Sequence, residues 1–165
     1  MKQLLILSGK GGTGKTTIAS AFIRLSDVKA YADCDVDAPN LHLIMAQHTE
    51  PERTDYIGMS KAEIDADRCI ECGLCKENCR FDAISCKNGY KVDPFACEGC
   101  GVCEAVCPAD AVSMKPAVAG ELMLYADDKK VFSTAQLKMG SGTSGKLVTE
   151  VKKQMKTAAN PDTKL

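Results

Sequence analysis

The chain has 165 residues, with 21 Lys and Arg, 22 Asp and Glu, and a formal net charge of −1. This length suits one domain, or a small domain inserted into part of another, and lysines interleaved with carboxylates argue against binding to nucleic acid. No apolar run is long enough to span a bilayer, and the short apolar start lacks a signal cleavage site. We therefore expect a cytoplasmic protein whose ten cysteines are mainly metal ligands rather than disulfides.

Residues 1–62 are predicted to open a parallel α/β sheet. The apolar run at residues 1–7 indicates a buried strand, and a glycine-rich turn follows it. A helix is then indicated by apolar side chains at helical spacing, namely Ile18, Ala21, Phe22 and Leu25. Residues 28–32 indicate a second strand that ends in an acidic cluster. Strand, glycine loop, helix and strand in this order are typical of a parallel sheet.

The glycine-rich turn fits the phosphate-binding pattern G-x-x-x-x-G-K-[ST]. Its backbone N–H groups and the positive end of the following helix favour phosphate oxygens. In this pattern Lys15 contacts the β- and γ-phosphates and Thr16 binds Mg²⁺, whereas a chance match is the alternative. The sequence thus predicts an ATP site made by Gly9, Lys10, Gly11, Gly12, Thr13, Gly14, Lys15, Thr16 and Thr17.

Lys10, the first lysine of this loop, is part of a motif that resembles one found in a known family. The run Lys-Gly-Gly-Thr-Gly-Lys-Thr-Thr from Lys10 resembles the deviant Walker A motif of the MinD/ParA/Mrp and nitrogenase iron-protein class of ATPases. The resemblance implies a P-loop fold of the SIMIBI type and a homodimer in which Lys10 reaches the partner's nucleotide. It also implies catalytic roles for Lys10, Lys15 and Asp35.

The acidic cluster after the second predicted strand extends the resemblance. Residues 33–43 are similar to the switch I segment of those ATPases, with an aspartate pair followed by Asn-Leu. This implies that Asp33 and Asp35 lie near Mg²⁺ and the attacking water, and we assign Asp33 to Mg²⁺. Which aspartate positions the water, and whether Asp37 contributes, is left open; a solvated loop is the alternative reading.

Residues 63–116 contain eight cysteines in two similar halves. Each half has a Cys-x-x-Cys-x-x-Cys run and a fourth cysteine after three further residues, which predicts two copies of one unit about a pseudo-twofold axis. Thiolates suit iron–sulfur clusters, and in two-cluster ferredoxins the fourth cysteine of each run ligates the other cluster. This predicts two 4Fe–4S clusters, cluster I on Cys69, Cys72, Cys75 and Cys107, and cluster II on Cys97, Cys100, Cys103 and Cys79.

Zinc is the alternative occupant of these cysteines. Zinc sites usually use two Cys-x-x-Cys pairs with a longer spacer, so the spacing here favours iron–sulfur clusters. One departure from the ferredoxin pattern is Arg80, which follows the fourth cysteine of the first run where the pattern has Pro. Cys34 and Cys86 lie outside the pattern, and we expect neither to have a redox role.

Residues 117–165 return to ordinary composition. A strand is indicated at residues 120–125, a flexible loop at 140–145, and a helix at 146–157 with Leu147, Val151 and Met155 at four-residue steps. Nothing after the cysteine segment matches the acidic Walker B strand that a P-loop NTPase uses for Mg²⁺. We therefore expect a truncated or split member of the family, and ATP hydrolysis is left unassigned.

The whole chain resembles MinD-superfamily P-loop ATPases that carry an inserted ferredoxin domain. Residues 1–62 and 117–165 would form an incomplete α/β P-loop domain, and residues 63–116 an inserted α+β ferredoxin-like domain. The resemblance implies that nucleotide state is coupled to electron transfer through the two 4Fe–4S clusters, with ATP and Mg²⁺ bound. The alternatives are an iron–sulfur or metallocofactor assembly carrier, and a ferredoxin-like electron carrier with an inert ATPase remnant.

Overall fold

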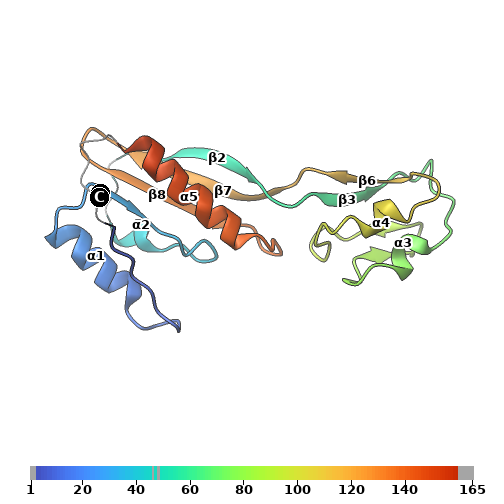
Figure 1. The fold of residues 1–165 in the computed structure, drawn as a ribbon, viewed down its shortest axis with the longest axis horizontal. Coiled ribbons are helices and arrows are strands. Elements are labelled where there is room, and N and C mark those ends of the chain that lie inside the picture. The colour runs from blue at the N-terminus through green and yellow to red at the C-terminus, as the bar shows by residue number, and fades with distance from the viewer. Residues whose placement is uncertain (1–2, 46, 48, 160–165) are drawn as a thin grey trace. The chain divides into compact units, whose positions relative to one another are not determined.

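The computed structural model describes residues 3–45, 47 and 49–159. The chain divides into two compact units, coloured in chain order in Figure 1. The first, the sheet unit, comprises residues 1–56, 120–137 and 144–165. The second, the cysteine unit, comprises residues 57–119 and 138–143.

The sheet unit is built on a mixed four-stranded sheet in the order β1-β8-β7-β2. Its strands are β1 (Ala30–Ala32), β2 (Glu52–Ile57), β7 (Val118–Ala126) and β8 (Val131–Leu137), and its helices are α1 (Lys15–Leu25), α2 (Leu41–Ile44) and α5 (Ser144–Ala158). β1 pairs in parallel with β8, with Ala30 opposite Val131, whereas β7 and β8 form an antiparallel hairpin. The strand predicted at residues 28–32 is therefore confirmed over Ala30–Ala32, but the sheet is mixed, not purely parallel.

The hairpin turn between β7 and β8 is held by one aspartate. The Asp127 carboxylate accepts hydrogen bonds from the backbone N–H groups of Lys129 and Lys130, both at 2.7 Å, and the Asp127 N–H donates to the Lys130 carbonyl at 3.0 Å. An Asp side chain that bonds to the backbone just ahead of it makes such turns without Gly or Pro. β7 confirms the strand predicted at residues 120–125, whereas β8 was not predicted.

Helices cover both faces of this sheet. On one face Phe132 stacks on Tyr31, with ring centroids 4.8 Å apart, and packs with Ile23 of α1 and Leu41 of α2. On the other face Ala30 and Val131 pack with Met155 of α5. Neighbouring residues of one strand thus face opposite layers, as the two-residue period of a strand requires.

Helix α5 confirms the prediction made from its spacing. Leu147, Val151 and Met155 are all buried, the first two fully, and α5 packs on β8 and β1 (Figure 1). The Ser133 hydroxyl of β8 donates to the Val151 carbonyl at 3.0 Å, which satisfies a buried polar group between helix and sheet.

The strand predicted at residues 1–7 is wrong over the part that the structure describes. Residues 3–8 are in neither strand nor helix, and Leu4, Leu5 and Leu7 are 71%, 67% and 77% exposed. A buried strand needs a neighbour to pair its backbone groups, and among the described residues the sheet comprises only the four strands named above. Across its described residues, 3–7, the apolar run therefore has no neighbour in the described sheet to bury it.

Helix α1 forms where it was predicted, but it buries other side chains. Ile18 and Phe22 are about half exposed and Leu25 is 88% exposed, whereas Ser20 and Ile23 are buried. The apolar spacing thus predicted the helix correctly without identifying its buried side.

The cysteine unit consists of two similar halves. Its elements are β3 (Lys61–Ile64), α3 (Leu74–Glu77), β4 (Ile84–Ser85), β5 (Lys91–Val92), α4 (Val102–Ala105) and β6 (Val112–Lys115), with β3 antiparallel to β6 and β4 antiparallel to β5. The Asp65 N–H donates to the Ala111 carbonyl at 2.8 Å, and the equivalent Asp93 N–H donates to the Ala83 carbonyl at 2.7 Å. The sequence repeat is therefore reproduced in the backbone hydrogen bonds.

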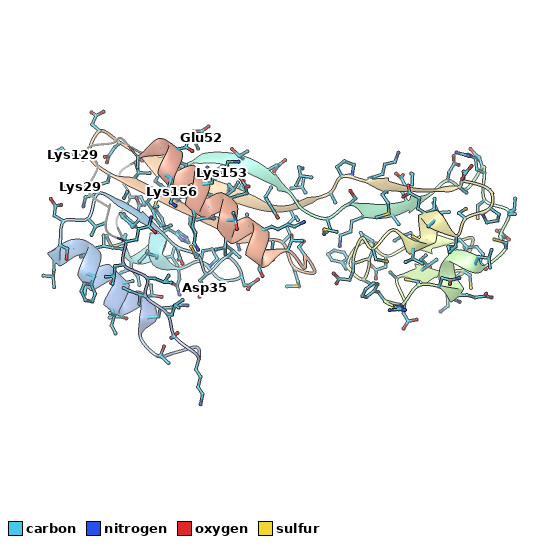
Figure 2. All side chains as sticks on the ribbon, viewed as in Figure 1. Lys29, Asp35, Glu52, Lys129, Lys153 and Lys156 are labelled. Atoms are coloured by element: carbon cyan, nitrogen blue, oxygen red, sulfur yellow. The ribbon has the colours of Figure 1, made fainter. Side chains whose placement is uncertain are left out.

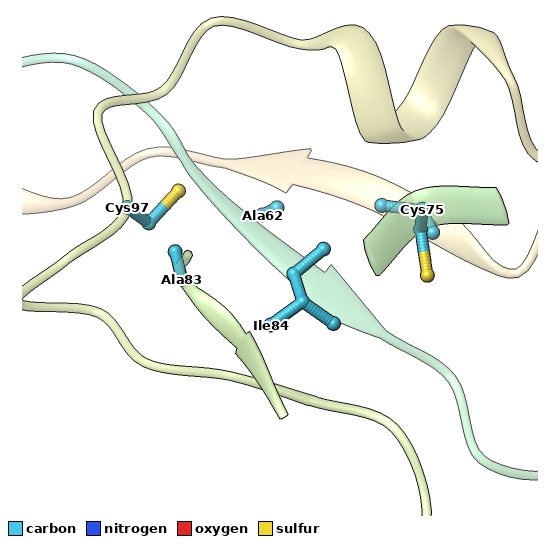
Figure 3. Close-up of a cluster of buried hydrophobic side chains, with 6 residues drawn as sticks. Ala62, Cys75, Ala83, Ile84 and Cys97 are labelled. Atoms are coloured by element: carbon cyan, nitrogen blue, oxygen red, sulfur yellow. The ribbon is translucent and has the colours of Figure 1, made fainter. Parts of the chain in front are cut away.

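A small core lies between the halves of the cysteine unit (Figure 3). It contains the buried side chains of Ala62, Cys75, Ala83, Ile84, Cys97 and Val112. In Figure 3, Cys97 and Cys75 lie on opposite sides of Ile84. The core thus separates one group of cysteines from the other.

Candidate functional site

Two cavities of nearly equal size lie in the cysteine unit, and each is lined by one predicted quartet of cysteines. The space between the walls, which is partly open to solvent, is about 330 Å³ for cavity I and about 350 Å³ for cavity II. Cysteines 69, 72, 75 and 107 line cavity I, and cysteines 79, 97, 100 and 103 line cavity II. The structure thus brings the eight cysteines together in the two groups that the ferredoxin pattern predicts.

The exchange of the fourth cysteine follows from the backbone. After α3 the chain passes through Cys79 to Ala83 and Ile84, which line cavity II. After α4 it passes through Cys107 to Ala111 and Val112, which line cavity I. The paired Asp-to-Ala backbone hydrogen bonds between the halves fix this crossing.

Gly99 makes one of the cysteine loops possible. Its φ of +71° lies in the left-handed region, and a Cβ built on it would lie 2.3 Å from the Ser60 carbonyl oxygen and 3.1 Å from the Met59 Cβ. Only glycine fits so close an approach at that φ. The loop that carries Cys97 and Cys100 past Ser60 therefore depends on this residue.

In each cavity, neighbouring cysteines disfavour deprotonation of a buried thiol, that of Cys75 in cavity I and that of Cys103 in cavity II. Burial raises the pKa of the Cys75 and Cys103 thiols, neighbouring backbone N–H groups lower it, and other thiols of the same cavity raise it again. For Cys75 those thiols are Cys69, Cys107 and Cys72, the rest of its predicted quartet. Four thiolates can share such a cavity only with a cationic centre between them, and a coordinated metal deprotonates its thiols.

Cys107 has the opposite shift. Burial raises the pKa of its thiol, but the backbone N–H groups of Ala111, Ala109 and Val112 outweigh that effect and lower it. The Ala111 N–H lies 3.3 Å from the Cys107 sulfur. Such N–H donors favour the thiolate and, in iron–sulfur proteins, help to set the reduction potential.

The donor set of each cavity fits a 4Fe–4S cluster, which needs four cysteine thiolates. Across residues 3–45, 47 and 49–159, no three His, Cys, Asp or Glu side chains gather tightly enough to hold a single metal ion. A zinc ion would need its four sulfurs at about 2.3 Å from one point. Here the sulfurs of each quartet instead border a cavity.

The two remaining cysteines line neither cavity. Cys34 is half-buried in the sheet unit, where burial raises the pKa of its thiol. Cys86 is exposed, and its sulfur lies 3.2 Å from the Lys76 ammonium nitrogen.

The glycine loop of the sheet unit leads directly into α1. Gly12 and Gly14 have φ of +73° and +80°, and a Cβ on either would meet nothing within 4 Å. Their positive φ, rather than close packing, is what calls for glycine there. The loop is exposed, as is the side chain of Lys10.

Two residues of the predicted nucleotide site, Lys15 for phosphate and Thr16 for Mg²⁺, contact the acidic segment after β1. The Lys15 ammonium lies 3.2 Å from the carboxylate of Asp35, which is labelled in Figure 2. The Thr16 hydroxyl donates to the Asn40 side-chain oxygen at 3.0 Å. No separate role was predicted for Asn40 from the sequence. Its position after the aspartate pair was the signal that could have indicated a contact with the glycine loop.

Asp33 organises that acidic segment. One oxygen of its carboxylate accepts the Asp35 N–H at 3.1 Å, and the other accepts the N–H groups of Asn40 and Leu41 at 3.2 and 3.1 Å. Asp33 thereby fixes the turn that brings Asp35 to Lys15. Asp37 is exposed in the same segment.

The cysteine unit is similar to a known protein family. Residues 62–114 match the family model described as a 4Fe-4S dicluster domain, which supports an iron–sulfur role for this part of the chain. An uncharacterized protein of Methanocaldococcus jannaschii is 38% identical over 95 residues, which are 56% of this chain and 33% of that protein. The chain thus spans about a third of the relative's length in this match.

In the part of the chain that the structure describes, no helix is long and apolar enough to cross a membrane.

Proposed function

We propose that this chain is an iron–sulfur electron carrier that holds one 4Fe–4S cluster in each cavity. The observation that carries the proposal is that each cavity is lined by a complete quartet of cysteines, with the fourth cysteine contributed by the other half. When bound, such clusters supply reversible one-electron chemistry at potentials that depend on their surroundings.

The residues around the cavities suit this role in two ways. Ile84 and Val112 are buried and line cavity II and cavity I, respectively, so they exclude water from one wall of each. Cys72 and Cys100 are exposed. Each site thus has a thiolate at the protein surface, where a redox partner can approach.

The test is anaerobic purification followed by iron and sulfide analysis and electron paramagnetic resonance of the reduced protein. Two 4Fe–4S clusters predict about eight irons and eight sulfides per chain. Cys72→Ser and Cys100→Ser should each remove about half of the iron, whereas Cys86→Ser, outside both cavities, should remove none. Stoichiometric zinc without sulfide, or loss of both clusters in either single variant, would contradict the proposal.

We further propose that the glycine loop binds the phosphates of ATP with Mg²⁺ and couples nucleotide state to electron transfer. The approach of Lys15 to Asp35 and of Thr16 to Asn40 beside the loop supports this second function. Lys10 would act across a homodimer, as in the ATPases that the loop resembles.

Two measurements separate this coupling from its alternatives. Calorimetry with Mg²⁺-ATP should show binding that Lys15→Ala abolishes, and electron transfer to an acceptor should change rate when ATP is added. Equal rates with and without ATP would reject the coupling, and no binding at all would leave a simple electron carrier. Rapid transfer of clusters to an apo-protein would instead favour an assembly carrier. Light scattering with and without nucleotide tests the homodimer.

A further inference from the structure

A lysine ammonium contacts one of the proposed cluster ligands. Lys61, the first residue of β3, donates a hydrogen bond from its Nζ to the backbone carbonyl of Cys97. Lys61 is half-buried, and Cys97 is 8% exposed and lines cavity II. The positive charge is therefore held against the backbone of a cysteine that lines cavity II, and it is partly shielded from solvent.

Among residues 3–45, 47 and 49–159, no lysine or arginine is seen to donate a hydrogen bond to a cysteine that lines cavity I. The repeat aligns Asp65 with Asp93, which places Gly89 at the position equivalent to Lys61. Arg68 does approach cavity I, but it is exposed and donates to the carbonyl of Ala109, which is not a ligand, at 3.3 Å. An exposed cation is screened by water and salt far more than a half-buried one.

One carboxylate borders each of the two cavities. Glu71 lines cavity I and Glu98 lines cavity II. Each cavity therefore has one acidic side chain in its wall. Lys61, which borders a separate pocket together with Glu98, adds a half-buried ammonium on the backbone of a cavity II cysteine.

Lys61 faces a like charge across the pair of β3 and β6. Lys61 lies directly opposite Lys115 in the antiparallel pair. Like charges directly opposite on neighbouring strands are destabilising. The Lys61 ammonium instead donates to the backbone carbonyl of Cys97, a residue that lines cavity II.

We infer that Lys61 raises the reduction potential of the cluster in cavity II above that of the cluster in cavity I, so that an electron shared by the two resides at cavity II. This inference rests on the proposed electron-carrier function. Reduction adds one electron to the site, with no bond made or broken, and a fixed ammonium nearby favours the more negative state by Coulomb attraction. Groups beyond the ligands commonly tune a metal in this way.

The experiment is a potentiometric titration with dithionite, followed by electron paramagnetic resonance, on the full chain. Lys61→Met removes charge and donor, Lys61→Gln removes the charge alone, and Lys61→Arg keeps both. In Lys61→Met and Lys61→Gln we expect the equilibrium constant for reducing the cluster in cavity II to fall about tenfold. This corresponds to a reduction potential about 59 mV lower for a one-electron couple. Lys61→Arg should stay near wild type. Titrations in the Cys72→Ser and Cys100→Ser backgrounds assign each potential to its cavity.

Lys115→Met is the matched control, because it removes the opposing charge without touching a ligand. The inference is overturned if Lys115→Met shifts the potential of cavity II as much as Lys61→Met, if cavity I shifts instead, or if Lys61→Gln and Lys61→Arg give the same potential. A wild-type chain without iron and sulfide would overturn the proposed function as well. Two loaded clusters with no shift would overturn this inference alone.

Discussion

The Lys15 ammonium lies 3.2 Å from the Asp35 carboxylate, with the two side chains 37% and 39% exposed. An ion pair this exposed contributes only about 0–1 kcal/mol to stability. The Lys15 ammonium can therefore exchange Asp35 for a phosphate oxygen at little energetic cost.

Removing that carboxylate should strengthen phosphate binding. Asp35→Asn leaves Lys15 without its competing anion, so we expect nucleotide affinity measured without Mg²⁺ to rise severalfold, while Lys15→Ala should lose binding. Lys29→Ala is the control, because Lys29 also contacts a carboxylate, that of Asp27, but lies outside the glycine loop. Weaker binding in Asp35→Asn would show that this carboxylate helps to hold the nucleotide.

Gly99 and Gly101 offer a matched pair of substitutions in the cysteine unit. Both have positive φ, but a Cβ on Gly99 would collide with the Ser60 carbonyl oxygen, whereas a Cβ on Gly101 meets nothing within 4 Å. We expect Gly101→Ala to lower the free energy of unfolding by about 1–2 kcal/mol, and Gly99→Ala by about 2–4 kcal/mol. Anaerobic urea unfolding measures both, and equal losses would mean that the chain shifts freely near Ser60.

Cys34 should react slowly with thiol reagents. Burial raises the pKa of its thiol, Lys152 lowers it and Asp33 raises it, with a net upward shift. Since the thiolate is the reactive form, iodoacetamide at about pH 8 should label exposed Cys86 before Cys34, with equal rates in urea. Mass spectrometry follows both, and faster labelling of Cys34 in the folded chain would contradict the prediction.

The same shift has a consequence for stability. The folded state holds the Cys34 proton to higher pH than the unfolded chain, so the protonated thiol contributes to the free energy of unfolding. That contribution is complete below the ordinary thiol pKa. It declines as the pH rises through the raised value. Cys34→Ala should remove this decline from the pH dependence of the unfolding free energy, and an unchanged pH dependence would count against it.

Leu147 should be among the residues on which the sheet unit most depends. Its side chain is fully buried, and Leu147→Ala is expected to lower the free energy of unfolding by about 2–5 kcal/mol. Leu25→Ala is the control, because Leu25 is 88% exposed on α1 and should change it by less than about 0.5 kcal/mol. Thermal or urea unfolding compares them, and similar losses would mean that Leu25 is buried in solution.

Patterns within a few residues predicted local structure well. The four-residue spacing of Leu147, Val151 and Met155 predicted α5 and its buried side, because a helix brings such residues to one face. The same reasoning predicted helix α1 but not its buried side, since Ser20 is buried there and Phe22 is half exposed. Which side of a helix is covered depends on what packs against it.

The sequence by itself determined the two groups of cysteines, because close spacing keeps three thiols of each run on one loop and the repeat supplies two such loops. Only the tertiary structure brought Lys61 to the Cys97 carbonyl and Asn40 to Thr16, and only it left Leu4 exposed without a strand to pair with. Contacts between residues distant in the chain depend on sheet pairing and on chain crossings. Those are decided by how the whole chain buries its apolar surface and satisfies its backbone hydrogen bonds.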